Sequence, residues 1–238
     1  MPLVTEPIAL ARRLTAEAVG TFCLLFAGTG AVVVNEVAGG PIGHGGVAAA
    51  FGLVIVVMIA SLGHISGAHF NPAITVAFAS TRHFPWRDVA PYIAAQLVGA
   101  LAASIALRGI FGDGTSLGVT AIAHVSATGG LGLEIGLTAV LALVIMSLAT
   151  DTRSVGALAA VAIGGTVGLQ ALVMGPITGA SMNPARSLAP AIVAANGTDL
   201  WLYVVGPFVG AVLGAALYQF LRAQPRPISQ TITAEETS

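Results

Sequence analysis

Apolar residues in this chain are gathered into six long runs, separated by short polar or glycine-rich segments. The runs cover about residues 14–34, 47–62, 89–108, 129–149, 155–174 and 200–221. A helix of about 20 residues crosses the ~30 Å hydrocarbon core of a bilayer, and most of the runs approach that length. We therefore expect an all-α membrane protein with six transmembrane helices.

Two shorter apolar segments are too short for a full crossing, and both begin with Asn-Pro-Ala. Residues 66–75 read Ser-Gly-Ala-His-Phe-Asn-Pro-Ala-Ile-Thr, and residues 178–187 read Thr-Gly-Ala-Ser-Met-Asn-Pro-Ala-Arg-Ser. Asn is a preferred N-cap and Pro is favoured at the first helical position, so the sequence predicts helix starts at Pro72 and Pro184. Each segment runs about ten residues, or ~15 Å, which is half of a bilayer core. We predict two half-helices that together make one crossing.

The two halves of the chain repeat each other beyond this motif. Equivalent positions are Glu17 and Glu134, Asn71 and Asn183, and Gly99 and Gly210, which are 117, 112 and 111 residues apart. Each half holds three spans, an odd number, so the second half must be inserted upside down relative to the first. We expect one channel domain over 1–238, with inverted repeats at about 10–108 and 129–222, a linker at 109–128 and a disordered tail at 223–238.

This inversion predicts where the half-helices meet. They enter from opposite faces, and their N-termini, each carrying roughly +0.5 charge, converge near Asn71 and Asn183. The preceding residues cannot be helical, so we expect their carbonyls to be free and to line a passage; they are Gly67, Ala68, His69 and Phe70, and Gly179, Ala180, Ser181 and Met182. Acceptors, two central amide donors and apolar walls suit a small neutral solute and exclude cations and protons.

The composition agrees with a membrane setting and excludes several other classes. Of the 238 residues, 56% are hydrophobic and 8% are charged, against roughly 25% charged in soluble domains. A net charge of -1 argues against nucleic acid as a partner. The single cysteine, Cys23, can form neither an internal disulfide nor a Cys-based metal site. We expect no cofactor and no metal.

The arginines predict the orientation in the membrane. With the N-terminus in the cytoplasm, seven arginines face the cytoplasm and two do not; the seven are Arg12, Arg13, Arg82, Arg87, Arg153, Arg222 and Arg226, and the two are Arg108 and Arg186. This bias predicts a multi-pass protein of the cell (plasma or inner) membrane with both termini cytoplasmic. A signal peptide is the competing interpretation of the first apolar run, but the run is too long and contains Glu17. Arg186 falls at membrane depth, where a charge is functional by default.

Two Asn-Pro-Ala boxes, one in each inverted half, resemble those of the aquaporin (major intrinsic protein) family. The boxes are Asn71, Pro72 and Ala73, and Asn183, Pro184 and Ala185. With Arg186 after the second box, the resemblance covers about residues 10–222. It implies a channel rather than an enzyme, with water and small neutral solutes as its partners. It also implies a homotetramer in the lipid bilayer, with a pore in every protomer.

The resemblance also implies an aromatic/arginine selectivity filter at Phe51, Ala171, Ala180 and Arg186. Strict water channels of the family typically carry His where this chain has Ala171, so the filter is expected to be wider and more apolar. Ser187 follows the arginine where glycerol facilitators usually carry Asp. This mixture is most similar to the nodulin-26-like branch and its bacterial relatives, which implies water, glycerol and uncharged metalloid acids as solutes. A strict water channel is the alternative.

Other classes of function remain open at this stage. Glu17 and Glu134 could belong to a proton-coupled transporter, since buried acids mark such relays, but their symmetric placement favours accepting donors from the non-helical loops. A secondary transporter shares inverted repeats and broken helices, yet no second midplane charge accompanies the arginine. An intramembrane hydrolase would need a nucleophile with a base, and Ser66 and His69 are near each other, but three residues across a non-helical loop fix no such geometry. A metal pair of His64 and His69 has no Cys or carboxylate nearby.

Overall fold

Eight helices make up the part of the chain that the computed structural model describes, residues 8–150 and 156–222, and no strand occurs in it. Six helices are long and apolar enough to cross a membrane: α1 (Leu10–Val37), α2 (Gly43–Ser66), α4 (Trp86–Phe111), α5 (Ala127–Ala149), α6 (Gly156–Thr178) and α8 (Leu202–Leu221). The two short ones are α3 (Pro72–Ser80) and α7 (Pro184–Val193). The predicted fold, six spanning helices and two half-helices, is confirmed. The tail predicted at 223–238 lies outside the described residues.

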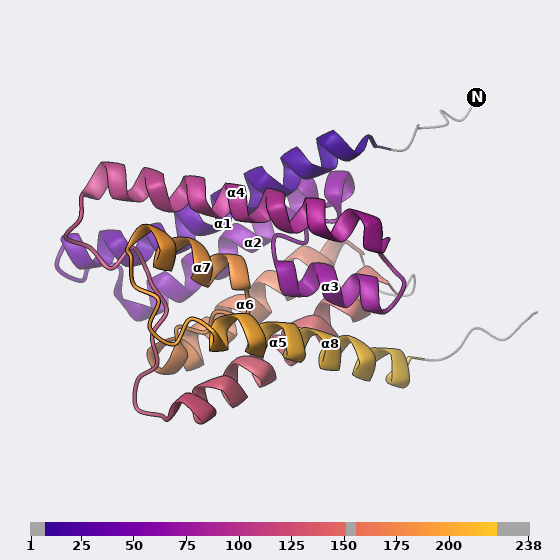
Figure 1. The fold of residues 1–238 in the computed structure, drawn as a ribbon. Helices are drawn as coiled ribbons and strands as arrows, with labels where there is room; N and C mark the ends of the chain where they lie inside the picture. The colour runs from indigo at the N-terminus through magenta and orange to yellow at the C-terminus, as the bar shows by residue number, and fades with distance from the viewer. Residues whose placement is uncertain (1–7, 151–155, 223–238) are drawn as a thin grey trace, which may run out of the picture.

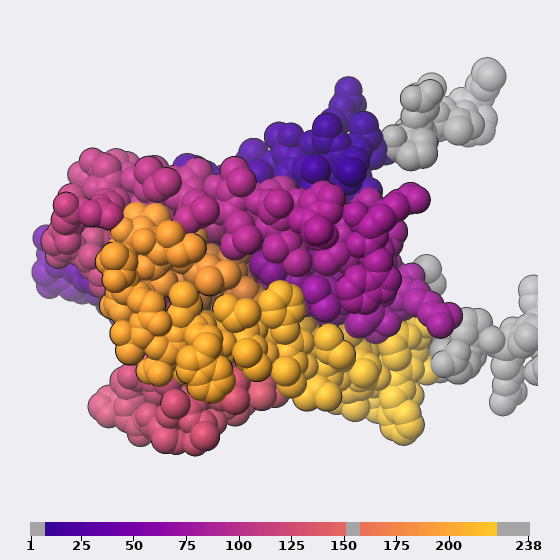
Figure 2. All heavy atoms as spheres, in the orientation of Figure 1, coloured from indigo at the N-terminus to yellow at the C-terminus, as the bar shows by residue number. Residues whose placement is uncertain are grey.

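The helices pack in the same way in both halves. Helix α1 contacts α2 and α4, and α5 contacts α6 and α8 in the same manner, while α2 and α6 pack against each other. Half-helix α3 contacts α4 and α8, and α7 contacts the same two helices. In Figure 1, α3 lies at the end of the bundle where α1 begins and α8 ends, and α7 lies at the other end. Figure 2 shows the orange residues of α7 directly against those of α4. The half-helices thus enter the bundle from opposite ends.

Glycines allow the long helices to approach at equivalent points. A Cβ on Gly99 would lie 2.0 Å from a carbonyl oxygen of α1, and a Cβ on Gly210 would lie 2.2 Å from a carbonyl oxygen of α5. At the α2–α6 crossing, a Cβ on Gly164 would lie 2.5 Å from the carbonyl oxygen of Gly52. Any side chain would separate these helices, as is typical of helix pairs in lipid.

Several helices extend beyond the predicted runs, among them α2 and α6. Helix α2 begins at Gly43, four residues before the expected start, and α6 ends at Thr178, four residues beyond the expected end. Helix α6 contains Pro176, which has no backbone N–H to donate to the carbonyl of Leu172 four residues earlier. The Nε2 atom of His44 donates to that oxygen at 2.7 Å. A side chain from α2 thus supplies the donor that the proline lacks.

Candidate functional site

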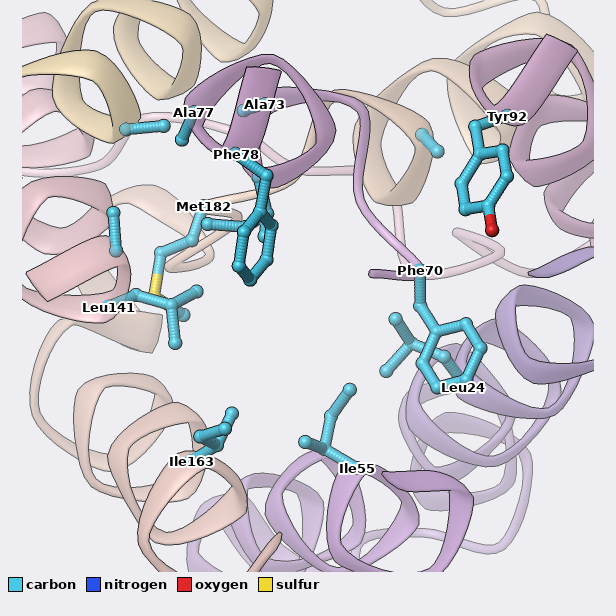
Figure 3. Packing of buried hydrophobic residues seen from close by; sticks show 14 of the residues in the cluster. Leu24, Ile55, Phe70, Ala73, Ala77, Phe78, Tyr92, Leu141, Ile163 and Met182 are labelled. Carbon is cyan, nitrogen blue, oxygen red and sulfur yellow. The ribbon is translucent and has the colours of Figure 1, made fainter. Parts of the chain in front are cut away.

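An elongated cavity of about 650 Å³ runs through the interior of the bundle. Helix α2 lines it from His44 to Gly63, which are 19 residues apart, and this distance along a helix is about 28 Å. The cavity therefore has nearly the length of a bilayer core. Figure 3 shows apolar side chains around it: Leu24, Ile55, Phe70, Phe78, Leu141, Ile163 and Met182. The cavity is a mostly apolar space that extends over nearly the thickness of a bilayer core.

The two Asn-Pro-Ala boxes start the half-helices at mid-length of this passage. Asn71 and Asn183 have extended backbones and cap α3 and α7, which begin at Pro72 and Pro184 as the sequence predicts. Each Asn Oδ1 accepts a hydrogen bond from the backbone N–H two residues further on, at 2.9 Å in α3 and 3.0 Å in α7. The caps hold both amide groups in fixed orientations.

The two boxes are also tied to each other. The Nδ2 atom of Asn71 donates to the carbonyl of Met182 at 2.7 Å, and Nδ2 of Asn183 donates to the carbonyl of Phe70 at 2.8 Å. These two carbonyls are therefore bonded, and the expectation that they are free is wrong. A side-chain amide has two N–H groups, and both asparagines line the cavity. Each has a second N–H for a molecule in the passage, beside two helix N-termini with roughly +0.5 charge each.

All eight residues of the loops before the boxes lie along the cavity: Gly67, Ala68, His69 and Phe70, and Gly179, Ala180, Ser181 and Met182. Both loops use the same unusual backbone conformation. Ala68 and Phe70 have φ of 51° and 48°, and their equivalents Ala180 and Met182 have φ of 41° and 53°. Such left-handed conformations cost about 1–3 kcal/mol per non-glycine residue. Contacts from outside the loops must offset this cost.

Glu17 supplies those contacts in the first half. Its side chain is fully buried, and each carboxylate oxygen accepts two hydrogen bonds. Oε1 accepts from the Ser66 hydroxyl at 2.7 Å and the His69 N–H at 3.0 Å. Oε2 accepts from the Phe70 N–H and from the Gln96 amide, both at 2.8 Å. The carboxylate satisfies the donors of the loop and fixes its conformation.

Glu134 has the same role in the second half, with one bond fewer. Oε1 accepts from the Thr178 hydroxyl at 2.8 Å and the Ser181 N–H at 2.9 Å, and Oε2 accepts from the Met182 N–H at 2.8 Å. The position in α8 equivalent to Gln96 is Pro207, which has no amide to donate. Sequence reasoning missed the hydroxyl donors, although a Ser or Thr stands five residues before each box asparagine.

The four residues named as a selectivity filter, Phe51, Ala171, Ala180 and Arg186, all line this same cavity. The Cζ atom of Arg186 lies 5.0 Å from the centroid of the Phe51 ring. Its Nη1 donates to the carbonyl of Gly118 at 2.7 Å. Gly118 belongs to the connection between α4 and α5, where nothing in the sequence pointed to the site. The side chains of Ala171 and Ala180 are only methyl groups and add no polar side-chain group to this region.

His69 packs in the first loop rather than forming a reactive pair. Its ring stacks on Phe78, with centroids 4.6 Å apart, and its Nδ1 lies 3.1 Å from the hydroxyl of Thr75. His64 is exposed and lies outside the cavity lining. Across residues 8–150 and 156–222, no group of three or more His, Cys, Asp or Glu side chains could hold a metal ion.

Comparison with known proteins agrees with this geometry. The family model of the major intrinsic protein matches residues 5–218. Aquaporin NIP1-3 of Oryza sativa subsp. japonica is 45% identical over 228 residues, covering 95% of this chain and 80% of that protein. Aquaporin NIP1-1 of Zea mays is 46% identical over 219 residues, covering 92% and 78%. The X-ray structure of the aquaglyceroporin from Plasmodium falciparum matches with a TM-score of 0.82 at 25% identity, covering 90% of this chain and 97% of that one. The chain therefore belongs to the major intrinsic protein family, whose members are membrane channels and not enzymes.

Proposed function

We propose that this protein is a passive channel for water and small uncharged solutes, including glycerol, and that they move through the cavity between the half-helices. The observation that carries the proposal is the reciprocal pair of bonds that holds Asn71 and Asn183 at the middle of a passage about 28 Å long. Backbone carbonyls on one wall accept hydrogen bonds, the two amides donate them, and the remaining walls are apolar. A neutral molecule with donors and acceptors can replace its lost hydration there.

The same arrangement opposes cations and protons. Two helix N-termini give a positive potential at the centre, which a cation would meet without its hydration shell. A water molecule that turns both lone pairs toward the asparagine donors cannot pass a proton along a chain of waters. The buried guanidinium of Arg186 adds a full positive charge along the passage.

We propose that Phe51, Ala171, Ala180 and Arg186 form the filter that selects solutes by size. Two of the four are alanines, so only the Phe51 ring and the guanidinium limit the width with large groups. This favours passage of glycerol and of uncharged metalloid acids beside water. The name of the structural neighbour, an aquaglyceroporin, supports a solute larger than water.

The orientation and assembly are part of the same proposal. The start of α1 and the end of α8 lie at one end of the bundle, where Arg13 pairs with Asp88 at 3.0 Å and Arg222 approaches His83 at 3.5 Å. We place this arginine-rich end in the cytoplasm, in the plasma or inner membrane. We also propose a homotetramer with a pore in each protomer, because the relatives are aquaporins. Light scattering of the purified protein in detergent tests the assembly.

Proteoliposome swelling with water, glycerol, urea and boric acid in parallel tests the function. We expect water and glycerol fluxes above those of empty liposomes and proportional to the gradient. A glycerol flux that saturates and follows an ion gradient would identify a secondary transporter instead. Rapid water flux with no glycerol flux would identify a strict water channel.

A further inference from the structure

The ring of Phe51 rests directly on the backbone of Gly28 in α1. A Cβ on Gly28 would lie 2.3 Å from Cε1 of this ring, 2.4 Å from Cδ1 and 2.8 Å from Cζ. Non-bonded carbon atoms are most stable about 3.5–4.0 Å apart, so the ring occupies the space of a missing side chain. Gly28 lies inside a regular helix, where any residue except proline could adopt the backbone conformation. The glycine is therefore required by the ring and not by the helix.

The ring lies between this glycine and the passage. Gly28 is buried and does not line the cavity, whereas Phe51 lines it and is 9% exposed. On the cavity side the ring faces the guanidinium of Arg186, 5.0 Å from its centroid. The distance between the Phe51 ring and the α1 backbone at Gly28 thus determines how far the ring projects toward Arg186.

We propose that Gly28 is a specificity-determining residue, which sets the width of the filter by leaving room for the Phe51 ring. The proposal rests on the proposed function, in which Phe51 is part of the filter. A methyl group at Gly28 displaces the ring by about 1 Å or more, because the contact distance must grow from 2.3 Å to about 3.5 Å. The ring moves toward the cavity, since α1 is packed behind the glycine and the cavity is open.

The test is the permeability of Gly28→Ala in proteoliposomes. One added methylene changes discrimination between substrates by about tenfold or more in a close-fitting site. We therefore expect the ratio of glycerol to water permeability to fall about tenfold, mainly through glycerol. Gly30→Ala is the matched control, because Gly30 is also buried in α1 but its Cβ would lie 3.4 Å from the nearest atom, Cδ2 of Leu107. The control should keep the wild-type ratio.

A second substitution separates this inference from the proposed function. Phe51→Leu removes the ring, so Gly28→Ala combined with Phe51→Leu should have the ratio of Phe51→Leu alone. If Phe51→Leu itself leaves the ratio unchanged, the filter assignment fails. If Phe51→Leu raises the ratio but Gly28→Ala keeps the wild-type value, the filter stands and the role of Gly28 is refuted. If Gly28→Ala fails to accumulate in membranes because its methyl group clashes with the ring, the double variant, which lacks the ring, should accumulate. Failure of the double variant to accumulate would refute the contact between Gly28 and Phe51.

Discussion

Replacing Glu17 by glutamine should destabilise this protein more than the same change at Glu134. Glutamine keeps the shape of the side chain but turns one acceptor oxygen into a donor. Each oxygen of Glu17 accepts two hydrogen bonds. Whichever oxygen becomes the NH2 group, one backbone N–H then faces a donor, and the Ser66 hydroxyl or the Gln96 amide must turn away from its present partners to accept from the new group. At Glu134, glutamine can place its NH2 group at Oε2, which accepts only from the N–H of Met182.

The number of lost bonds gives the size of the effect. A hydrogen bond to a charged group contributes about 1.5–3 kcal/mol to stability. Glu17→Gln loses two such bonds, which corresponds to about 3–6 kcal/mol, and Glu134→Gln loses one, about 1.5–3 kcal/mol. The expected difference in stability between the two variants corresponds to one hydrogen bond. The Gln96 amide donates this bond to Glu17, whereas Pro207 has no N–H to donate to Glu134.

Thermal unfolding of the purified protein in detergent measures this order. We expect the melting temperature to fall from wild type to Glu134→Gln and further to Glu17→Gln. In a Gln96→Leu background, the two substitutions should have equal effects, because each carboxylate then has three donors. An equal or larger loss for Glu134→Gln in the wild-type background would refute the reasoning. Loss of flux in either variant without loss of stability would instead favour a proton relay.

Three further predictions follow from the cavity and its lining. Arg186→Val removes the buried charge and should raise proton and cation leak, measured with a pH-sensitive dye and by sodium flux. An unchanged leak would contradict the assignment of Arg186 to the filter. Ala171→His should narrow the filter and lower glycerol permeability far more than water permeability, whereas equal losses would contradict the filter assignment. His44→Ala removes the donor to the α6 carbonyl that Pro176 frees, and should cost about 0.5–1.5 kcal/mol of stability, the net contribution of one hydrogen bond. An unchanged melting temperature would show that this bond contributes little.

Much of the fold could be predicted because its signals are local. Asn followed by Pro marks the start of a helix, so the starts of α3 and α7 at Pro72 and Pro184 were predicted correctly. The end of α6 was not, because the apolar run ends at about residue 174 and the donor to the carbonyl of Leu172 comes from His44, 128 residues away in the sequence. A local pattern contains no information about such a partner.

The site shows the same division. The spacing of Glu17 and Glu134 predicted that both carboxylates would receive loop donors, since symmetric positions in a repeat meet the same backbone. The carbonyls of Phe70 and Met182 were predicted to be free because nothing in the sequence shows that each asparagine donates to the opposite loop. The bond from Arg186 to Gly118 was also missed, because the α4–α5 connection follows no periodic pattern.

The central claim, that two helix N-termini and their asparagine amides make the middle of the passage positive, is tested most directly by sodium flux through Asn183→Asp. Aspartate keeps the capping oxygen for the N–H of Ala185. It replaces the amide, which donates to the carbonyl of Phe70 and into the passage, with a negative charge. We predict that reconstituted Asn183→Asp keeps conducting water and gains a sodium leak that the wild type lacks. Normal water flux with no sodium leak would contradict the account.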